Sequence, residues 1–286
     1  MGAPQPALRS GSRPLEETLA CLEQRRQNNT SLSDALAVYR QIFSVQSRFF
    51  NLFEFSRTGF YTQTQGVPLF PGPLPELDPE IPRQALSEVS DAFLEAAPGH
   101  RQEIEAARAS CEAEDVLLRR ISRDHLNPGA QTLLLLALNP FYEKLACQVL
   151  PRLEEQVGAS AVGELGLCPV CGEAPSMAKF DAANGARFVQ CRLCRTQRML
   201  SRLRCAFCGS EDGKKLGYLQ AETDRAHRAE VCDSCGGYLK AVDERALAAR
   251  TILHVEELLM TALDQEAIRR GYAPGRVRPK RGEVAA

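Results

Sequence analysis

Eight cysteines arranged as four CxxC pairs are the residues of this sequence best suited to chemistry. They lie at Cys168, Cys171, Cys191, Cys194, Cys205, Cys208, Cys232 and Cys235. A CxxC turn brings two thiolates within reach of one ion, and two such turns complete a tetrahedral site. In a reducing compartment, repeated CxxC pairs favour metal binding over a set of disulfides. The remaining cysteines, Cys21, Cys111 and Cys147, stand alone in helical patterns, where a cysteine usually acts as a small apolar residue.

Three pairings of the four CxxC turns are possible. Nested pairing closes the stretch CRLCRTQRMLSRLRCAFCG around one ion and leaves the outer pairs for another. Crossed pairing resembles a cross-brace, in which the middle pairs usually lie closer together than they do here. Sequential pairing gives the spacings C-x2-C-x19-C-x2-C and C-x2-C-x23-C-x2-C, which suit a ribbon whose intervening chain forms a hairpin.

An internal repeat favours the sequential pairing. CPVCGEAP parallels CAFCGSED, and ARFVQCRLC parallels HRAEVCDSC. Between the first two pairs, Asn184-Gly185 is typical of a tight hairpin turn. Three of the four pairs are followed by glycine, and Cys194 is followed by Arg195. We therefore predict two tandem rubredoxin-like or zinc-ribbon modules, over 166–203 and 204–242.

The donor set leaves the identity of the metal open. Four cysteines suit zinc, and they also suit iron in the manner of rubredoxin, although zinc binds such ligands more tightly than ferrous iron. No histidine or carboxylate replaces a cysteine, so neither site keeps an obvious open position. We expect two metal ions, iron or zinc, in closed sites that are structural or transfer electrons.

Arginines crowd the link between the two middle pairs. Between Ala182 and Arg204 there are six of them and no acidic residue: Arg187, Arg192, Arg195, Arg198, Arg202 and Arg204. Two divalent ions in eight thiolates add negative charge, and one interpretation is that these arginines offset it. The alternatives are an acidic protein surface or a nucleic acid as partner. The candidates for a partner-binding face are Arg192, Arg195, Arg198 and Arg202.

Catalytic motifs are missing from the sequence. It has four histidines, none of them in a nucleophile motif, and neither a phosphate-binding loop nor a dinucleotide fingerprint. We therefore predict a protein that is not an enzyme and has no catalytic residues.

The elements that must position the cysteines fall on either side of them. Residues 14–165 are predicted to form a helical bundle, with an apolar stripe at Val38, Ile42, Val45, Phe49 and Leu52. Asn127-Pro128 and Asn139-Pro140 each resemble a helix start, which predicts helices at about 128–138 and 140–157. The proline-rich segment 67–82 is expected to be extended. A C-terminal helix is predicted over 243–272, and loose tails over 1–13 and 273–286. The fold class is therefore multidomain α+β.

Composition and net charge indicate which partners and which location to expect. The chain has 286 residues, 44% of them hydrophobic and 25% charged, with a net charge of -1. This balance gives no general reason to expect nucleic acid or an anionic membrane as a partner. No segment has the ~20 consecutive apolar residues of a membrane helix. We expect a soluble, cytoplasmic protein.

Taken together, the helical N-terminal region, the CPVCG opening and the stretch CDSCGGYLK followed by a helix ending in RRGY resemble the formate dehydrogenase accessory (FdhE-like) protein family. The resemblance implies a cytoplasmic, non-catalytic maturation factor that binds iron through rubredoxin-like sites and contacts the catalytic subunit of formate dehydrogenase. It also implies that all eight paired cysteines are metal ligands. A rubredoxin-like electron carrier and a zinc-ribbon protein that binds nucleic acid are the alternatives.

Overall fold

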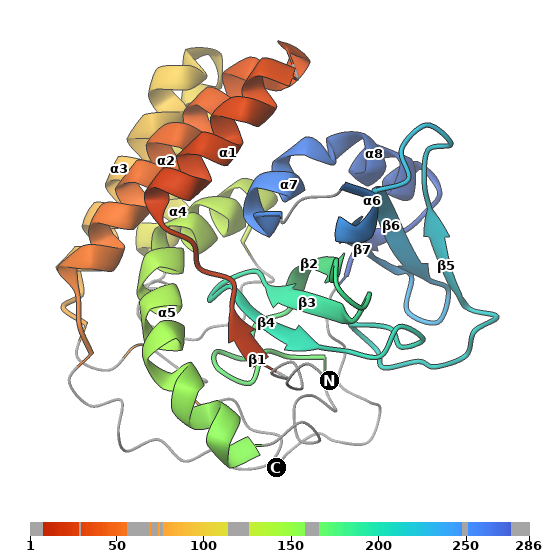
Figure 1. The fold of residues 1–286 in the computed structure, drawn as a ribbon. Coiled ribbons are helices and arrows are strands. Elements are labelled where there is room, and N and C mark those ends of the chain that lie inside the picture. The colour runs from red at the N-terminus through yellow and green to blue at the C-terminus, as the bar shows by residue number, and fades with distance from the viewer. Residues whose placement is uncertain are drawn as a thin grey trace. The chain divides into compact units, whose positions relative to one another are not determined.

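The computed structural model describes residues 8–28, 30–55, 69, 74, 77–113, 126–157, 166–247 and 251–275. The chain divides into two compact units, which Figure 1 draws as helices in one part and a sheet in the other. The helical unit comprises Ser12–Tyr61 and Phe70–Val149, and the sheet unit comprises Met1–Gly11, Thr62–Leu69 and Leu150–Ala286. The predicted α+β class is confirmed. The predicted domain limits stay predictions.

Helices build the first unit from amphipathic segments. They are α1 (Leu15–Asn28), α2 (Ser33–Leu52), α3 (Glu80–Ala96), α4 (Arg101–Ala113) and α5 (Pro128–Val157), with short 3-10 turns at Thr30–Leu32 and Pro98–His100. On α2, Ile42 and Phe49 are buried as predicted, whereas Leu52 at the end of the helix is exposed. Half of the predicted extended segment 67–82 lies outside the described residues. Its end is helical, because α3 begins at Glu80 with Pro82 in the first turn, where a missing amide hydrogen is not needed.

The prediction of two helices around Asn139-Pro140 is wrong. Asn127 does cap a helix, since its Oδ1 accepts from the Ala130 amide at 2.9 Å, but α5 then runs through Pro140 without a break. A proline inside a helix leaves the carbonyl four residues earlier without its usual donor. Here Gln46 of α2 supplies one, as its Nε2 donates to the Leu136 carbonyl at 2.8 Å.

One stretch of α5 also meets the length and composition of a membrane span. Among the described residues, it is the segment Pro128–Pro151, with a mean hydropathy of 1.2. Within that stretch, 72% of the apolar window is buried inside the fold. Burial of this kind is typical of the core helix of a soluble protein.

The second unit is built on one eight-stranded sheet. Its strands are β1 (Leu8–Ser10), β2 (Pro175–Phe180), β3 (Arg187–Cys191), β4 (Thr196–Met199), β5 (Leu216–Leu219), β6 (His227–Cys232), β7 (Gly237–Asp243) and β8 (Ala273–Pro274). They lie in the order β1-β4-β3-β2-β7-β6-β5, with β8 paired to β7. The antiparallel meanders β2-β3-β4 and β5-β6-β7 are joined by a parallel pairing of β2 with β7. The two cysteine modules therefore share one sheet.

Strand alternation gives this sheet two different faces. One face packs against α7 (Leu253–Leu259) and α8 (Thr261–Arg269), through Met177, Val242, Ala229 and Tyr238 among others. The opposite face carries a second core that includes Phe180, Leu239 and Ala241. Leu200, Ala206 and Phe207 pack into that second core, so the stretch that joins the two modules covers this face. We call the face of the sheet that carries Phe180, Leu239 and Ala241 the seam face.

The two ends of the chain differ from the prediction. The expected loose tail 1–13 contributes β1, because Leu8 is buried and the Arg9 guanidinium lies 3.6 Å from the centre of the Phe188 ring. The expected tail 273–286 begins with β8, and residues 276–286 lie outside the described residues. The single helix predicted over 243–272 is instead divided into α6 (Glu244–Leu247), α7 and α8. The Glu244 carboxylate accepts hydrogen bonds from the amide and hydroxyl of Thr251, both at 3.0 Å, which connects α6 to the residues just before α7.

Candidate metal centres

The eight paired cysteines gather into two groups of four, as the sequential pairing predicts. One group is Cys168, Cys171, Cys191 and Cys194, and the other is Cys205, Cys208, Cys232 and Cys235. Within each group, all sulfur atoms lie within 4.8 Å of one another. Two sulfur pairs are 3.4 Å apart in the first group, and two are 3.7 and 3.8 Å apart in the second. A tetrahedron with metal–sulfur bonds of about 2.3 Å has edges of about 3.8 Å, so both groups fit one ion.

The residue that follows each CxxC pair has a left-handed backbone conformation, which lets the two cysteines of the pair face the same site. Gly172, Gly209 and Gly236 have φ angles of 73°, 71° and 69°. Arg195, which stands in the position of the missing glycine, has a φ of 56° and is the one non-glycine residue with positive φ in the described part of the chain. The Leu193 amide donates to Sγ of Cys191, and the Phe207 amide donates to Sγ of Cys205, with nitrogen–sulfur distances of 3.4 Å in both cases. The arginine therefore keeps the turn geometry, at the expense of backbone strain.

Charge in these groups calls for a cation. Burial raises the pKa of Cys171 and Cys194 well above that of an ordinary thiol, and it raises the pKa of Cys205 to about 11. Burial opposes ionisation of Cys168 too, but hydrogen bonds from the neighbouring thiols hold its pKa well below the ordinary value. Four buried thiolates at these distances repel one another strongly, and a divalent ion would offset that repulsion. The donor set thus fits a thiolate-bound metal.

Exposure to solvent distinguishes the two centres. All four cysteines of the first group are buried. In the second group Cys205 and Cys232 are buried, whereas Cys208 and Cys235 are partly exposed. The second centre is therefore the one that solvent, a chelator or a redox partner can approach.

The four arginines predicted to bind a partner do not form one exposed face. Arg195 and Arg198 are only 9% and 3% exposed. Arg198 donates to the Gly166 carbonyl at 2.9 Å, and burial lowers its pKa to about 10. Arg192 forms an ion pair with Glu173 at 2.7 Å, and Arg202 is exposed. For all four arginines a role in partner binding stays a prediction.

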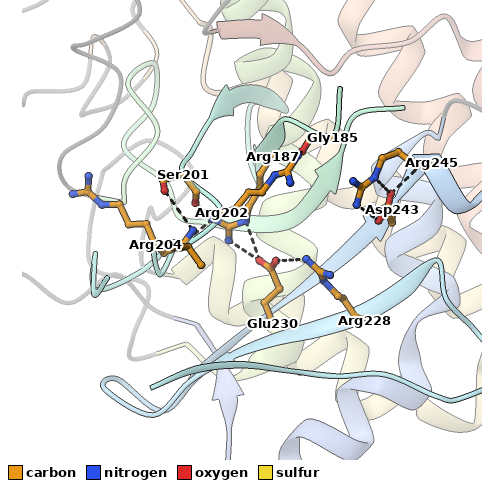
Figure 2. A network of polar contacts seen from close by, with 10 residues as sticks. Gly185, Arg187, Ser201, Arg202, Arg204, Arg228, Glu230, Asp243 and Arg245 are labelled. Carbon is orange, nitrogen blue, oxygen red and sulfur yellow. Dashed lines mark hydrogen bonds and ion pairs between the residues drawn. The ribbon is translucent and has the colours of Figure 1, made fainter. Parts of the chain in front are cut away.

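Sequence reasoning missed the charged residues that lie near Arg187 and Arg202 on the seam face, namely Arg228, Glu230, Asp243 and Arg245. Arg187 of β3 is buried and forms an ion pair with Glu230 of β6 at 2.6 Å. Arg228 of β6 also donates to Glu230, at 3.2 Å, and Arg245 of α6 pairs with Asp243 at 2.6 Å (Figure 2). In the sequence Arg228, Glu230, Asp243 and Arg245 lie far from Arg187, so only the pairing of the strands brings them together.

Comparison with known proteins agrees with this site. Residues 167–202, which hold the whole first cysteine group, match the family described as FdhE, central domain. The chain is similar to the FdhE family over these residues. A protein FdhE homolog of Edwardsiella ictaluri is 26% identical over 209 residues, covering 71% of this chain and 61% of the relative. The protein FdhE of Escherichia coli O127:H6 is 34% identical over 116 residues, covering 39% of this chain and 36% of the relative.

A solved structure supports the same fold for the FdhE-like chain. The crystal structure of the FdhE protein from Pseudomonas aeruginosa matches with a TM-score of 0.59 and 20% identity, covering 96% of this chain and 97% of that one. The sequence matches, in contrast, span less than two thirds of the length of the curated relatives. The family resemblance read from the CxxC stretches is thus confirmed.

Proposed function

We propose that this FdhE-like chain is a cytoplasmic, non-catalytic accessory factor needed for active formate dehydrogenase. The observation that carries the proposal is the pair of complete four-cysteine groups within an FdhE-like fold. In this proposal the eight cysteines hold two metal ions, iron or zinc, and the catalytic subunit of formate dehydrogenase is the partner.

Closed donor sets limit what the metal ions can do. With four thiolates around each ion, no coordination position is left for a substrate, so hydrolysis at the metal is not expected. Iron in such a site supplies one-electron chemistry, whereas zinc supplies only structure. The role of the chain's own residues is to fix the sulfurs through the CxxC turns and to exclude water from the first centre.

Partial exposure of Cys208 and Cys235 favours a second candidate, a rubredoxin-like electron carrier. That function needs an iron centre near the surface, and the second centre meets the requirement of access. Nucleic-acid binding has less support, because Arg187, Arg195 and Arg198 of the arginine-rich link are buried.

The test is anaerobic purification followed by metal analysis and capture of the partner. The full chain should contain two metal ions, and it should retain the formate dehydrogenase catalytic subunit from a co-expressing lysate. Cys171→Ser and Cys208→Ser should each remove one ion and weaken capture, while the matched control Cys147→Ser, outside both groups, should change neither. Capture that survives the loss of both ions would contradict the proposal. A redox-active iron spectrum without partner capture would favour the electron carrier.

A further inference from the structure

A cavity of about 340 Å³ opens on the seam face, next to the second cysteine group. Its walls come from both modules: Arg187 of β3, Arg202 of the link, Arg228 and Glu230 of β6, and Arg245 of α6. Figure 2 shows these side chains converging from separate elements. Its volume is in the range of cavities that hold small-molecule ligands.

Positive charge exceeds negative charge among these side chains. Arg187 and Arg228 share a single carboxylate, Glu230. Arg245 is neutralised by Asp243, but Arg202 donates to the carbonyl oxygens of Asn184 and Gly185, which are not charged. Arg228 also keeps a buried Nε without a hydrogen-bond acceptor. Arg204 also lines the cavity and lies 3.9 Å from Glu211, so five guanidinium groups face three carboxylates. An anion would complete the balance.

Gly185 lets two of these cations approach one another at the wall of the cavity. A Cβ at this position would lie 2.5 Å from Nη2 of Arg202 and 2.8 Å from Nη1 of Arg245. The φ of Gly185 is +65°, so the hairpin turn itself favours glycine here. Asp243 offsets the charge of Arg245, and an anion bound between the two guanidinium groups would offset the charge of Arg202.

We propose that this cavity binds a small phosphate-bearing anion. Guanidinium forks match the oxygens of phosphate in bidentate geometry, and several forks arranged around a concave site favour a compact, multiply charged group. The small volume of about 340 Å³ fits such an anion better than it fits a nucleic-acid backbone, which needs an extended basic surface.

The competing explanation is that these arginines only offset the charge of the second metal centre. Cys205 and Cys232 line the same cavity, so their thiolates lie on its wall. In that case, removing the arginines would weaken metal retention rather than anion binding. The two explanations therefore predict different losses in the same variant.

Calorimetric titration of the metal-loaded full chain with inorganic pyrophosphate tests the proposal. The double variant Arg202→Gln/Arg245→Gln should bind pyrophosphate at least about tenfold more weakly, since each lost charged hydrogen bond contributes about a factor of ten. The control Arg269→Gln, on the exposed end of α8 and paired with Glu266, should bind like the unmodified chain. Metal content is measured after each titration, and both variants should keep two ions.

Several results would overturn the proposal. They are no binding of pyrophosphate by the unmodified chain, undiminished binding by the double variant, or equal binding of the dicarboxylate succinate. Loss of metal from the second centre in the double variant, with anion binding unchanged, would establish charge compensation instead.

Discussion

Arg187 and Glu230 form an ion pair across the two cysteine modules, with Nη2 and Oε2 2.6 Å apart and the arginine side chain 3% exposed. The same guanidinium donates to the carbonyls of Ser201 and Arg204, both at 3.0 Å. One arginine of the first module is therefore bonded both to the second module and to the link. Because the modules also share a sheet, we expect them to unfold together.

Replacing Glu230 by Gln should destabilise the sheet unit strongly. The change leaves Arg187 buried without its carboxylate, and loss of one partner of a buried ion pair costs about 3 kcal/mol or more. Urea unfolding of the metal-loaded protein measures the difference. Glu211→Gln is the matched control, because Glu211 lies 3.9 Å from Arg204 and its side chain is 67% exposed. Equal losses of stability in Glu230→Gln and Glu211→Gln would contradict a stabilising role of the ion pair between Arg187 and Glu230.

A second prediction concerns the left-handed turn after Cys235. Gly236 has a φ of +69°, and a Cβ there would meet no atom within 4 Å, so the effect of Gly236→Ala comes from the backbone alone. Strain of this kind costs about 1–2 kcal/mol. The variant should unfold at lower urea concentration and release the second metal ion faster. Gly213→Ala is the control, since a Cβ at Gly213 also meets nothing and no positive φ is involved.

Stability should also depend on pH through His227. Its ring lies between Asp224, at 2.8 Å, and the buried Glu256, at 3.1 Å. The hydrogen bond to Glu256 is the main reason why the pKa of His227 is raised above its usual 6.5. A raised folded-state pKa gives stability that is fully present below pH 6.5 and is lost as pH rises through the folded value.

Replacement of His227 by Gln should therefore reduce stability more at pH 6 than at pH 9. Urea midpoints measured across this range, for both proteins with metal bound, give the comparison. His100→Gln serves as control, because the His100 side chain is 68% exposed beside Glu103. A constant difference between His227→Gln and the unmodified protein at all pH values would contradict the prediction.

Gln46 and Pro140 should be coupled energetically. If Gln46 replaces the donor that Pro140 lacks, Gln46→Leu leaves the partly buried Leu136 carbonyl without this donor, which costs about 1 kcal/mol. In a Pro140→Ala background the backbone amide returns, so the same change should cost less. A double-mutant cycle measured by urea unfolding gives the coupling energy. Additive effects would mean that the glutamine does not act through this carbonyl.

How far the sequence predicted this structure depends on the range of each interaction. The cysteine groups and the Asn184-Gly185 turn were predictable because short spacings and local backbone preferences decide them. Asn139-Pro140 was misread because an asparagine before a proline also fits a helix interior, when a residue 90 positions away supplies the missing donor. The parallel pairing of β2 with β7 and the cavity on the seam face depend on contacts between distant strands. No short sequence pattern predicts those contacts.

Metal release should separate the two centres. Since Cys208 and Cys235 are partly exposed and the first group is buried, a chromophoric chelator should take one ion quickly and the other slowly. Cys208→Ser should remove the fast phase and Cys171→Ser the slow one, measured anaerobically by absorbance of the chelate. Cys21→Ser, which lies outside both groups, should leave both phases intact. Loss of both ions from either single variant would mean that the centres are not independent, and a single release rate would mean that burial does not control access.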